Sequence, residues 1–147
     1  MRLLLDTNVL VLWIAGHLQQ SLIGKHRRLR EYDEDDFAIV DALARKHEMH
    51  VSTPHVLTET SNFLGAGRPQ MVSGGTDTLN DYIAGLNEIY TPSKTIAALP
   101  EMHTLGLTDT AIFHLGKEGI QVVSMDFHLC NLLQLKGVSA VNPRHFR

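Results

Sequence analysis

The spacing of apolar residues changes along this chain, and each change marks the border between a predicted strand and a predicted helix. Leu3–Leu5 is a continuous apolar run, which predicts a strand buried on both faces of a sheet. Directly after Asp6 the apolar spacing becomes three and four residues, which predicts a helix that includes Val9–Trp13. Asp6 is therefore expected at a strand end, either as a helix N-cap or as part of a ligand site.

The same pattern continues to the end of the chain. Further strands are predicted at 49–52, 120–125 and 138–141, and further helices at 37–47, 53–64, 76–90, 92–99, 108–119 and around 129–136. The helix at 53–64 has the best-marked ends, with Thr53 as the cap, Pro54 at the first position and Gly65 as the stop. Strands that alternate with helices predict an α/β fold with a central parallel sheet covered on both faces.

Length and composition limit the classes of protein that fit. The 147 residues predict one domain, 1–147, and a hydrophobic content of 44% is enough for a real core. No apolar run approaches the ~20 residues that cross a bilayer, and no signal peptide is found at the start. The single cysteine, Cys130, fits a reducing compartment, so we expect a cytoplasmic protein without membrane contact.

Charge bears on nucleic-acid binding. The net charge of −3 excludes binding through overall charge, so binding would need a local basic surface or bridging metal ions. Lys25, Arg27, Arg28 and Arg30 form a basic run directly before the acidic run 31–36. This segment is either a solvated, mutually screened stretch or a basic flap beside a phosphate-binding groove.

Four acidic residues stand out by their positions. Asp6 and Asp126 each follow a predicted strand, so both should lie at the same edge of a parallel sheet. Asp109 follows the expected cap Thr108 in the first turn of a helix, where it would at least stabilise the helix dipole. Glu59 lies near the apolar stripe of its helix, where a carboxylate is costly unless it is paired or bound to a cation.

The segments around these acids resemble the four acidic motifs of the PIN-domain family. The segments are Leu-Leu-Leu-Asp6-Thr-Asn-Val-Leu, Val-Leu-Thr-Glu59-Thr-Ser-Asn-Phe-Leu, Leu-Gly-Leu-Thr-Asp109-Thr-Ala-Ile and Val-Ser124-Met-Asp126-Phe-His-Leu. They occur in the order and at the intervals of that family, over residues 3 to about 143. Two departures are Thr110, where alanine is more usual, and a long segment from Ala15 to Asp36.

The resemblance implies a three-layer α/β/α sandwich that binds Mg²⁺ or Mn²⁺ and cuts RNA. Asp6, Glu59, Asp109 and Asp126 would bind metal or orient metal-bound water, which agrees with the preference of hard divalent cations for carboxylate oxygens. Asn8 and Ser124 would support the acids or orient phosphate. Small members of the family are often toxins of toxin–antitoxin pairs, so a small antitoxin is an expected partner, and a homodimer stays open.

Other functions remain as alternatives. A PIN-fold module that binds metal or protein without cutting, and an RNA-processing nuclease without an antitoxin, fit the same motifs. A zinc site among His47, His50 and His55 lacks the usual helical ligand spacing. A phosphatase with Asp6 as nucleophile would want a second aspartate where this chain has Asn8.

Overall fold

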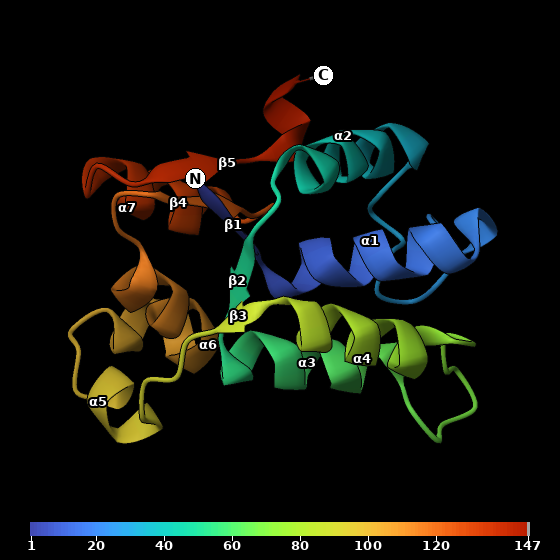
Figure 1. Cartoon of the computed structure of the whole chain (residues 1–147), viewed down its shortest axis with the longest axis horizontal. Coiled ribbons are helices and arrows are strands. Elements are labelled where there is room, and N and C mark those ends of the chain that lie inside the picture. The colour runs from blue at the N-terminus through green and yellow to red at the C-terminus, as the bar shows by residue number, and fades with distance from the viewer. Residues whose placement is uncertain (147) are drawn as a thin grey trace.

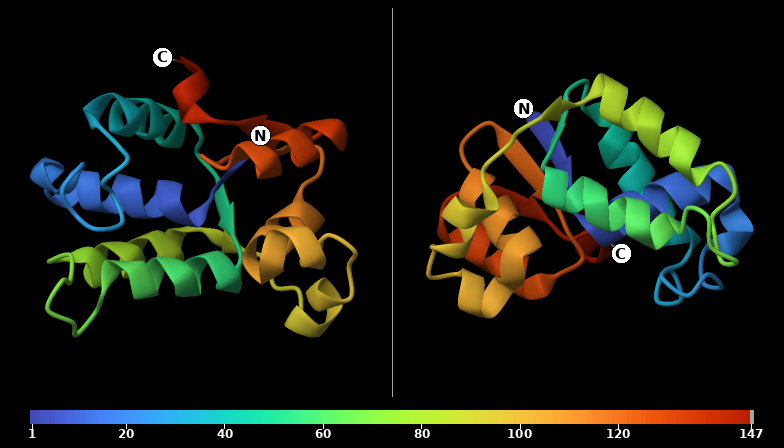
Figure 2. Two further views of the ribbon diagram at one scale, coloured as in Figure 1. Left: turned by 180° about the vertical axis from the view of Figure 1, so that it is seen from behind. Right: turned by 90° about the horizontal axis from the view of Figure 1, so that it is seen from below.

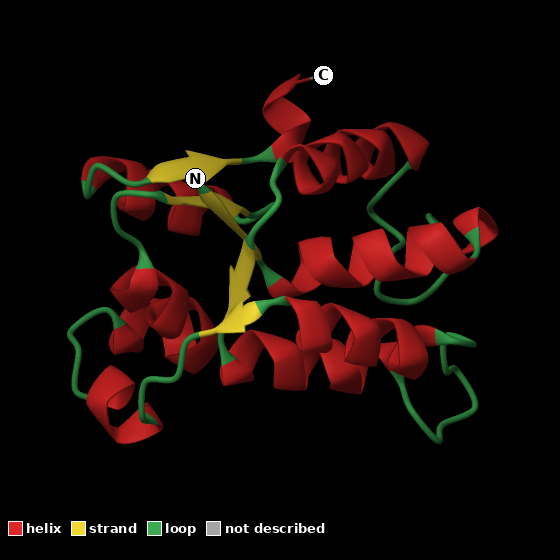
Figure 3. Cartoon of the chain, in the orientation of Figure 1, coloured by secondary structure: helices red, strands yellow, loops and turns green. Residues whose placement is uncertain are grey.

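A computed structural model describes residues 1–146 and shows a five-stranded, all-parallel sheet in the order β3-β2-β1-β4-β5 (Figures 1 and 3). The strands are β1 (Arg2–Leu5), β2 (His50–Ser52), β3 (Asn87–Glu88), β4 (Ile120–Val123) and β5 (Ser139–Val141). The first strand of the chain is thus the central strand of the sheet. The predicted α/β fold with a parallel sheet is confirmed.

Helices cover both faces of the sheet, which gives the three layers of an α/β/α sandwich. The α-helices of residues 1–146 are α1 (Thr7–Leu18), α2 (Glu34–Lys46), α3 (Pro54–Leu64), α4 (Gly75–Gly85), α5 (Ser93–Ala97), α6 (Met102–Leu115) and α7 (Phe127–Leu135), with 3₁₀ turns at Gln20–Leu22 and Pro143–Phe146. Helix α1 packs against α2, α3 and α4 on one side, and α6 packs against α7 on the other (Figures 1 and 2).

The hydrophobic core is built around β1. Leu3–Leu5 are at most 1% exposed, and β1 pairs with β2 on one side and with β4 on the other. Burying each of these side chains contributes roughly 1.5–3 kcal/mol, which explains why a run of leucines occupies the centre of the sheet. The residue that follows this run, Asp6, is therefore held at the carboxyl edge of the best-packed strand.

Several helix ends follow the sequence closely. Thr53 caps α3 by accepting a hydrogen bond from the Val56 amide at 3.2 Å, and α3 ends at Gly65. Gly65 has φ 75°, a conformation that glycine adopts without strain. Helix α2 begins earlier than predicted, at Glu34, because Asp33 and Asp36 cap its start reciprocally.

Two further predicted boundaries are wrong. The helix expected at 76–90 ends at Gly85, and Asn87–Glu88 instead pairs with β2 as the edge strand β3. The helix expected to begin at Thr108 begins at Met102 and is interrupted at Gly106, whose φ of 77° and ψ of 176° are not helical. The second part of α6 therefore starts just before Asp109, so this acid still lies in a first helical turn.

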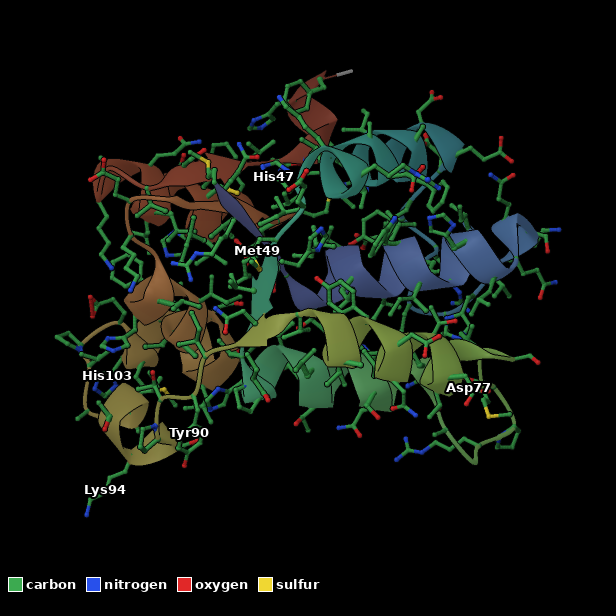
Figure 4. The ribbon with its side chains drawn as sticks, in the orientation of Figure 1. His47, Met49, Asp77, Tyr90, Lys94 and His103 are labelled. Atoms are coloured by element: carbon green, nitrogen blue, oxygen red, sulfur yellow. The ribbon has the colours of Figure 1, made fainter. Side chains whose placement is uncertain are left out.

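Outer surfaces carry polar and aromatic side chains that point away from the sheet, such as Lys94 and the 71% exposed Tyr90 (Figure 4). None of the helices within residues 1–146 is long and apolar enough to cross a membrane.

Candidate active site

The four acids predicted from the sequence line one cavity at the carboxyl edge of the sheet. This cavity of about 680 Å³, here called the acid cavity, is lined by Asp6, Glu59, Asp109 and Asp126 together with polar and apolar neighbours. Asp6 follows β1, and Asp126 lies between β4 and α7. Glu59 comes from α3 and Asp109 from α6, and these two helices contact each other at this edge.

Asp6 is the most buried of the four, with 8% of its surface exposed. Its Oδ1 accepts a hydrogen bond from the Thr7 amide at 2.7 Å, and its Oδ2 accepts one from the Ser124 hydroxyl at 2.7 Å. Burial raises the pKa of Asp6 against the lowering effect of these two hydrogen bonds, and the charges of Asp126 and Glu59 raise the pKa further. The position is thus costly for a negative charge in the absence of a cation.

Glu59 is held by two threonine hydroxyls from different helices. Thr7 on α1 donates to Oε1 at 3.0 Å, and Thr108 on α6 donates to Oε2 at 2.7 Å. Both carboxylate oxygens are therefore oriented, and the carboxylate links three helices at the cavity. The predicted role of Thr108 as a helix cap is wrong, because its hydroxyl binds Glu59 instead.

Asp109 is the acid whose charge is least supported. Burial and then the charges of Asp6, Asp126 and Glu59 raise the pKa of Asp109 to about 7. Within residues 1–146, no hydrogen-bond donor reaches its carboxylate. The carboxylate is therefore available to a ligand that carries positive charge.

Asp126 has a structural role as well as a place at the cavity. Its Oδ1 accepts a hydrogen bond from the Leu129 amide at 3.0 Å, so it caps α7. Its own amide donates to the Ser124 hydroxyl at 3.0 Å. Because Ser124 also donates to Asp6, one serine connects the backbone of the fourth acid with the carboxylate of the first.

The remaining predicted residues divide between the cavity and its surroundings. Asn8 lines the acid cavity from the exposed start of α1, and Ser124 lies buried beneath Asp6. Of the predicted basic run, Arg28 lines this cavity, whereas Lys25, Arg27 and Arg30 do not.

Sequence reasoning missed several residues at this site, among them a fifth acid, Glu31. Thr7, Thr108, Tyr32 and Arg144 all line the cavity. The two threonines each stand directly beside a predicted acid, which was a signal that a hydroxyl was available there. Arg144 offered no such signal, because it lies near the end of the chain and donates to the Glu31 carbonyl, 113 residues earlier, at 2.6 Å.

The donor set suits a hard divalent cation in its chemistry, since it consists of carboxylates whose mutual repulsion a cation would relieve. As placed, however, no three His, Cys, Asp or Glu side chains in the described part of the chain could bind one ion together. A cation such as Mg²⁺, which keeps several waters and meets only a few carboxylates, fits this arrangement better than an ion that needs a complete protein cage.

Comparison of the chain with models of known protein families found no match, and comparison with curated proteins found none either. The resemblance to the PIN-domain family therefore stays a prediction, carried by the four motifs.

Proposed function

We propose that this protein is a divalent-metal-dependent ribonuclease of the PIN type. The observation that carries the proposal is the convergence of Asp6, Glu59, Asp109 and Asp126, from four separate parts of the chain, on one cavity. Asp6 and Asp109 both have raised pKa values because of burial and neighbouring carboxylates. Charges that are costly and gathered in a cleft are typical of functional sites.

In this proposal each acidic residue has its own role. Asp6 and Asp109 would hold Mg²⁺ or Mn²⁺, and Asp126 would orient metal-bound water. Both oxygens of Asp6 accept a hydrogen bond and still retain a free lone pair for the metal. When bound, the metal supplies activation of a water nucleophile and neutralisation of charge on a phosphate. Glu59, fixed by its two threonines, keeps one orientation toward the cavity and positions the nucleophilic water.

Two arginines at the rim complement the acids. Arg28 and Arg144 both line the acid cavity, and guanidinium groups match the geometry of phosphate oxygens. In this proposal they contact the RNA backbone at the acid cavity. Attack by water then leaves a 5′-phosphate and a 3′-hydroxyl.

The biological setting belongs to the same proposal and rests on family analogy. The protein acts in the cytoplasm as the toxin of a toxin–antitoxin pair and is held inactive by a small antitoxin. Co-expression with the product of a neighbouring short reading frame tests this part, because an antitoxin would abolish the growth defect that the ribonuclease causes.

The catalytic proposal is tested with acid-to-amide variants on a panel of RNAs and DNAs. Asp6→Asn, Glu59→Gln and Asp109→Asn should each lose most activity while staying folded by circular dichroism, and Asp126→Asn should lose less. Asp77→Asn is the matched control, because this exposed acid in the first turn of α4 does not line the cavity (Figure 4). Chelation should stop cleavage, and added Mn²⁺ or Mg²⁺ should restore it.

The competing function is a PIN-fold module that binds metal or protein without cutting. The observation in its favour is that no three ligating side chains in residues 1–146 are preassembled for one ion. Calorimetric metal binding without cleavage of any RNA in the panel would establish this alternative. Cleavage that survives both chelation and Asp6→Asn would exclude the proposed mechanism, once contaminating nuclease is ruled out by identical preparation.

A further inference from the structure

A second cavity opens beside the acid cavity and has the opposite chemical character. It measures about 270 Å³ and is lined by the loop at 26–28, the end of α3 and the loop at 65–70. We call it the basic cavity, and its charged and aromatic lining consists of His26, Arg27, Arg28, Phe63 and Arg68. Arg28 and Phe63 line both cavities, so the two are neighbours with a shared wall.

The charges of the basic cavity are available to a ligand. No acidic residue lines it, whereas five acidic residues, the four predicted acids and Glu31, line the acid cavity next to it. Among residues 1–146, no carboxylate lies within 4.0 Å of the guanidinium of Arg27, Arg28 or Arg68. All three arginines are exposed, so an anionic ligand reaches them without breaking an existing ion pair.

The two loops that form the walls are joined by His26. Its Nδ1 accepts a hydrogen bond from the Arg28 amide at 3.2 Å, and its Nε2 lies 3.2 Å from the Gln70 carbonyl. These contacts require the tautomer in which Nε2 carries the proton. One imidazole therefore ties the backbone of the loop that carries Arg27 to the backbone of the loop that carries Arg68.

The shared wall combines a cation with an aromatic ring. The Arg28 guanidinium carbon lies 3.9 Å from the centre of the Phe63 ring, which is a cation–π contact. A guanidinium beside an aromatic ring is a group on which an unpaired base can stack. Stacking of this kind does not depend on the identity of the base, so it suits a site that binds single strands of varied sequence.

We propose that the basic cavity is a phosphate subsite for single-stranded RNA, in which Arg27 and Arg68 bind a backbone phosphate adjacent to the one held at the acid cavity. This inference rests on the proposed ribonuclease function. It extends that function by naming the surface that binds the RNA strand beyond the acid cavity. It also divides the basic run, because Arg27 and Arg28 belong to the path of the RNA whereas Lys25 and Arg30 line neither cavity.

RNA fits this cavity better than an acidic protein segment for two reasons. The cavity continues into the acid cavity, where the proposed function already places a phosphate, so a strand that carries phosphates at regular intervals engages both cavities at once. The arginine forks and the aromatic neighbour also match phosphates alternating with bases.

The experiment compares two double variants that remove the same charge from the same region. Fluorescence anisotropy with a short, fluorescein-labelled single-stranded RNA, in chelator to prevent cleavage, measures binding at several salt concentrations. Arg27→Ala/Arg68→Ala should weaken binding roughly 10- to 30-fold at about 0.1 M salt and lower the salt slope by about 0.7, since the two arginines share one phosphate and each neutralised phosphate of a single strand contributes about 0.7. Lys25→Ala/Arg30→Ala should bind nearly as wild type.

The possible outcomes test the phosphate subsite and the ribonuclease function separately. Equal weakening in both double variants, or none in either, would overturn the subsite and leave the ribonuclease proposal standing if wild type cleaves RNA. RNA binding that is weakened only in Arg27→Ala/Arg68→Ala, without RNA cleavage by the wild type in any metal, would support the subsite and overturn the ribonuclease proposal. Unchanged RNA binding by Arg27→Ala/Arg68→Ala with lost binding of labelled polyglutamate would assign the cavity to an acidic protein partner instead.

Discussion

The Ser124 hydroxyl donates a hydrogen bond to the Asp6 carboxylate at 2.7 Å, although the two residues lie 118 positions apart in the chain. The same hydroxyl accepts a hydrogen bond from the Asp126 amide at 3.0 Å, and Ser124 is completely buried. A residue just beyond β4 thus fixes the acid at the end of β1. The contact is possible because β1 and β4 are parallel neighbours whose carboxyl ends meet at one edge.

Ser124→Ala tests whether this hydrogen bond positions the Asp6 carboxylate for the proposed metal binding. The substitution removes a hydrogen bond that lowers the pKa of Asp6, so that pKa should rise and the acidic limb of the pH–rate profile should move to higher pH. Metal affinity or kcat/KM should fall by about 10- to 100-fold, as is usual when a group that orients a metal ligand is lost. Loss of the buried hydrogen bonds should also destabilise the fold by about 1–3 kcal/mol.

The control is Ser139→Ala, which removes a serine hydroxyl from β5 that only accepts a hydrogen bond from Gln121. It should leave the pH–rate profile in place. A profile that moves equally in both serine variants, or in neither, would show that Ser124 contributes only packing.

The position of Asp6 could be predicted because its determinants are local. A run of leucines that ends in an aspartate and passes into helical spacing requires a strand end, and alternation of strands with helices places that end at the ligand-binding edge. The bounds of α3 were equally well marked, because the Thr53 hydroxyl caps the helix three residues away, and Pro54 and Gly65 act through their own backbone conformations.

A second prediction concerns the threonines that hold Glu59. Thr108→Val keeps the shape of the side chain but removes the 2.7 Å hydrogen bond to Oε2. A hydrogen bond to a charged group contributes about 1.5–3 kcal/mol, so kcat should fall by roughly one to two orders of magnitude if that contact orients the carboxylate. Thr108→Ser retains the hydroxyl and should recover most of the activity.

Thr104→Val is the matched control on the same helix, since the Thr104 hydroxyl donates only to the Glu101 carbonyl at an exposed site. Its kinetics should equal those of the wild type. If Thr108→Ser is as inactive as Thr108→Val, the effect comes from packing around α6 and the orientation of Glu59 is irrelevant.

A third prediction concerns pH and the stability of the metal-free protein. The pKa of Asp109 is raised in the folded state from 3.8 to about 7. Between these values the folded state binds more protons than the unfolded state, so the free energy of unfolding should fall as pH rises through this window and level off above it. Asp109→Asn lacks this dependence and should melt at a higher temperature than wild type at neutral pH, with the difference shrinking toward about pH 4.

Added metal should reverse the order of the melting temperatures of wild type and Asp109→Asn. If the acids form the proposed metal site in the folded state alone, millimolar Mg²⁺ or Mn²⁺ should raise the melting temperature of the wild type by mass action, but raise that of Asp109→Asn less. Asp81→Asn, at an exposed acid on α4, should behave as wild type in both experiments. Equal metal-induced shifts in wild type and Asp109→Asn would mean that Asp109 does not share the metal site.

Features that the sequence did not reveal are those created by contacts between distant segments. Asn87–Glu88 has two polar, exposed residues, and only its pairing with β2 makes it a strand. The start of α6 was misplaced because Gly106 interrupts the helix, so the apolar spacing before it does not continue in phase with the spacing after it. Arg144 was missed because every contact that gives it a role lies more than a hundred residues away.

The last prediction therefore concerns Arg144, which joins the end of the chain to the segment before α2. Its Nη2 donates to the Glu31 carbonyl at 2.6 Å, its Nε lies 3.9 Å from a carboxylate oxygen of the buried Asp36, and its guanidinium lies 5.2 Å from the Tyr32 ring centre. The Arg144 side chain is 41% exposed, so screening by water reduces the value of these contacts. Arg144→Ala should lower the free energy of unfolding by about 1–2 kcal/mol, or roughly 2–8 °C in Tm.

Arg45→Ala provides the comparison, because the Arg45 side chain is 66% exposed and pairs with Asp41 within one helix, where such pairs contribute only about 0.3–0.5 kcal/mol. Chemical denaturation of the two variants beside wild type measures the difference. Because Arg144 also lines the acid cavity, Arg144→Ala should weaken RNA binding as well, whereas Arg45→Ala should not. If the two variants are equally stable, the contacts of Arg144 with Glu31, Tyr32 and Asp36 are no stronger than an ordinary surface pair, and the 31–36 segment is held at the cavity by its buried side chains alone.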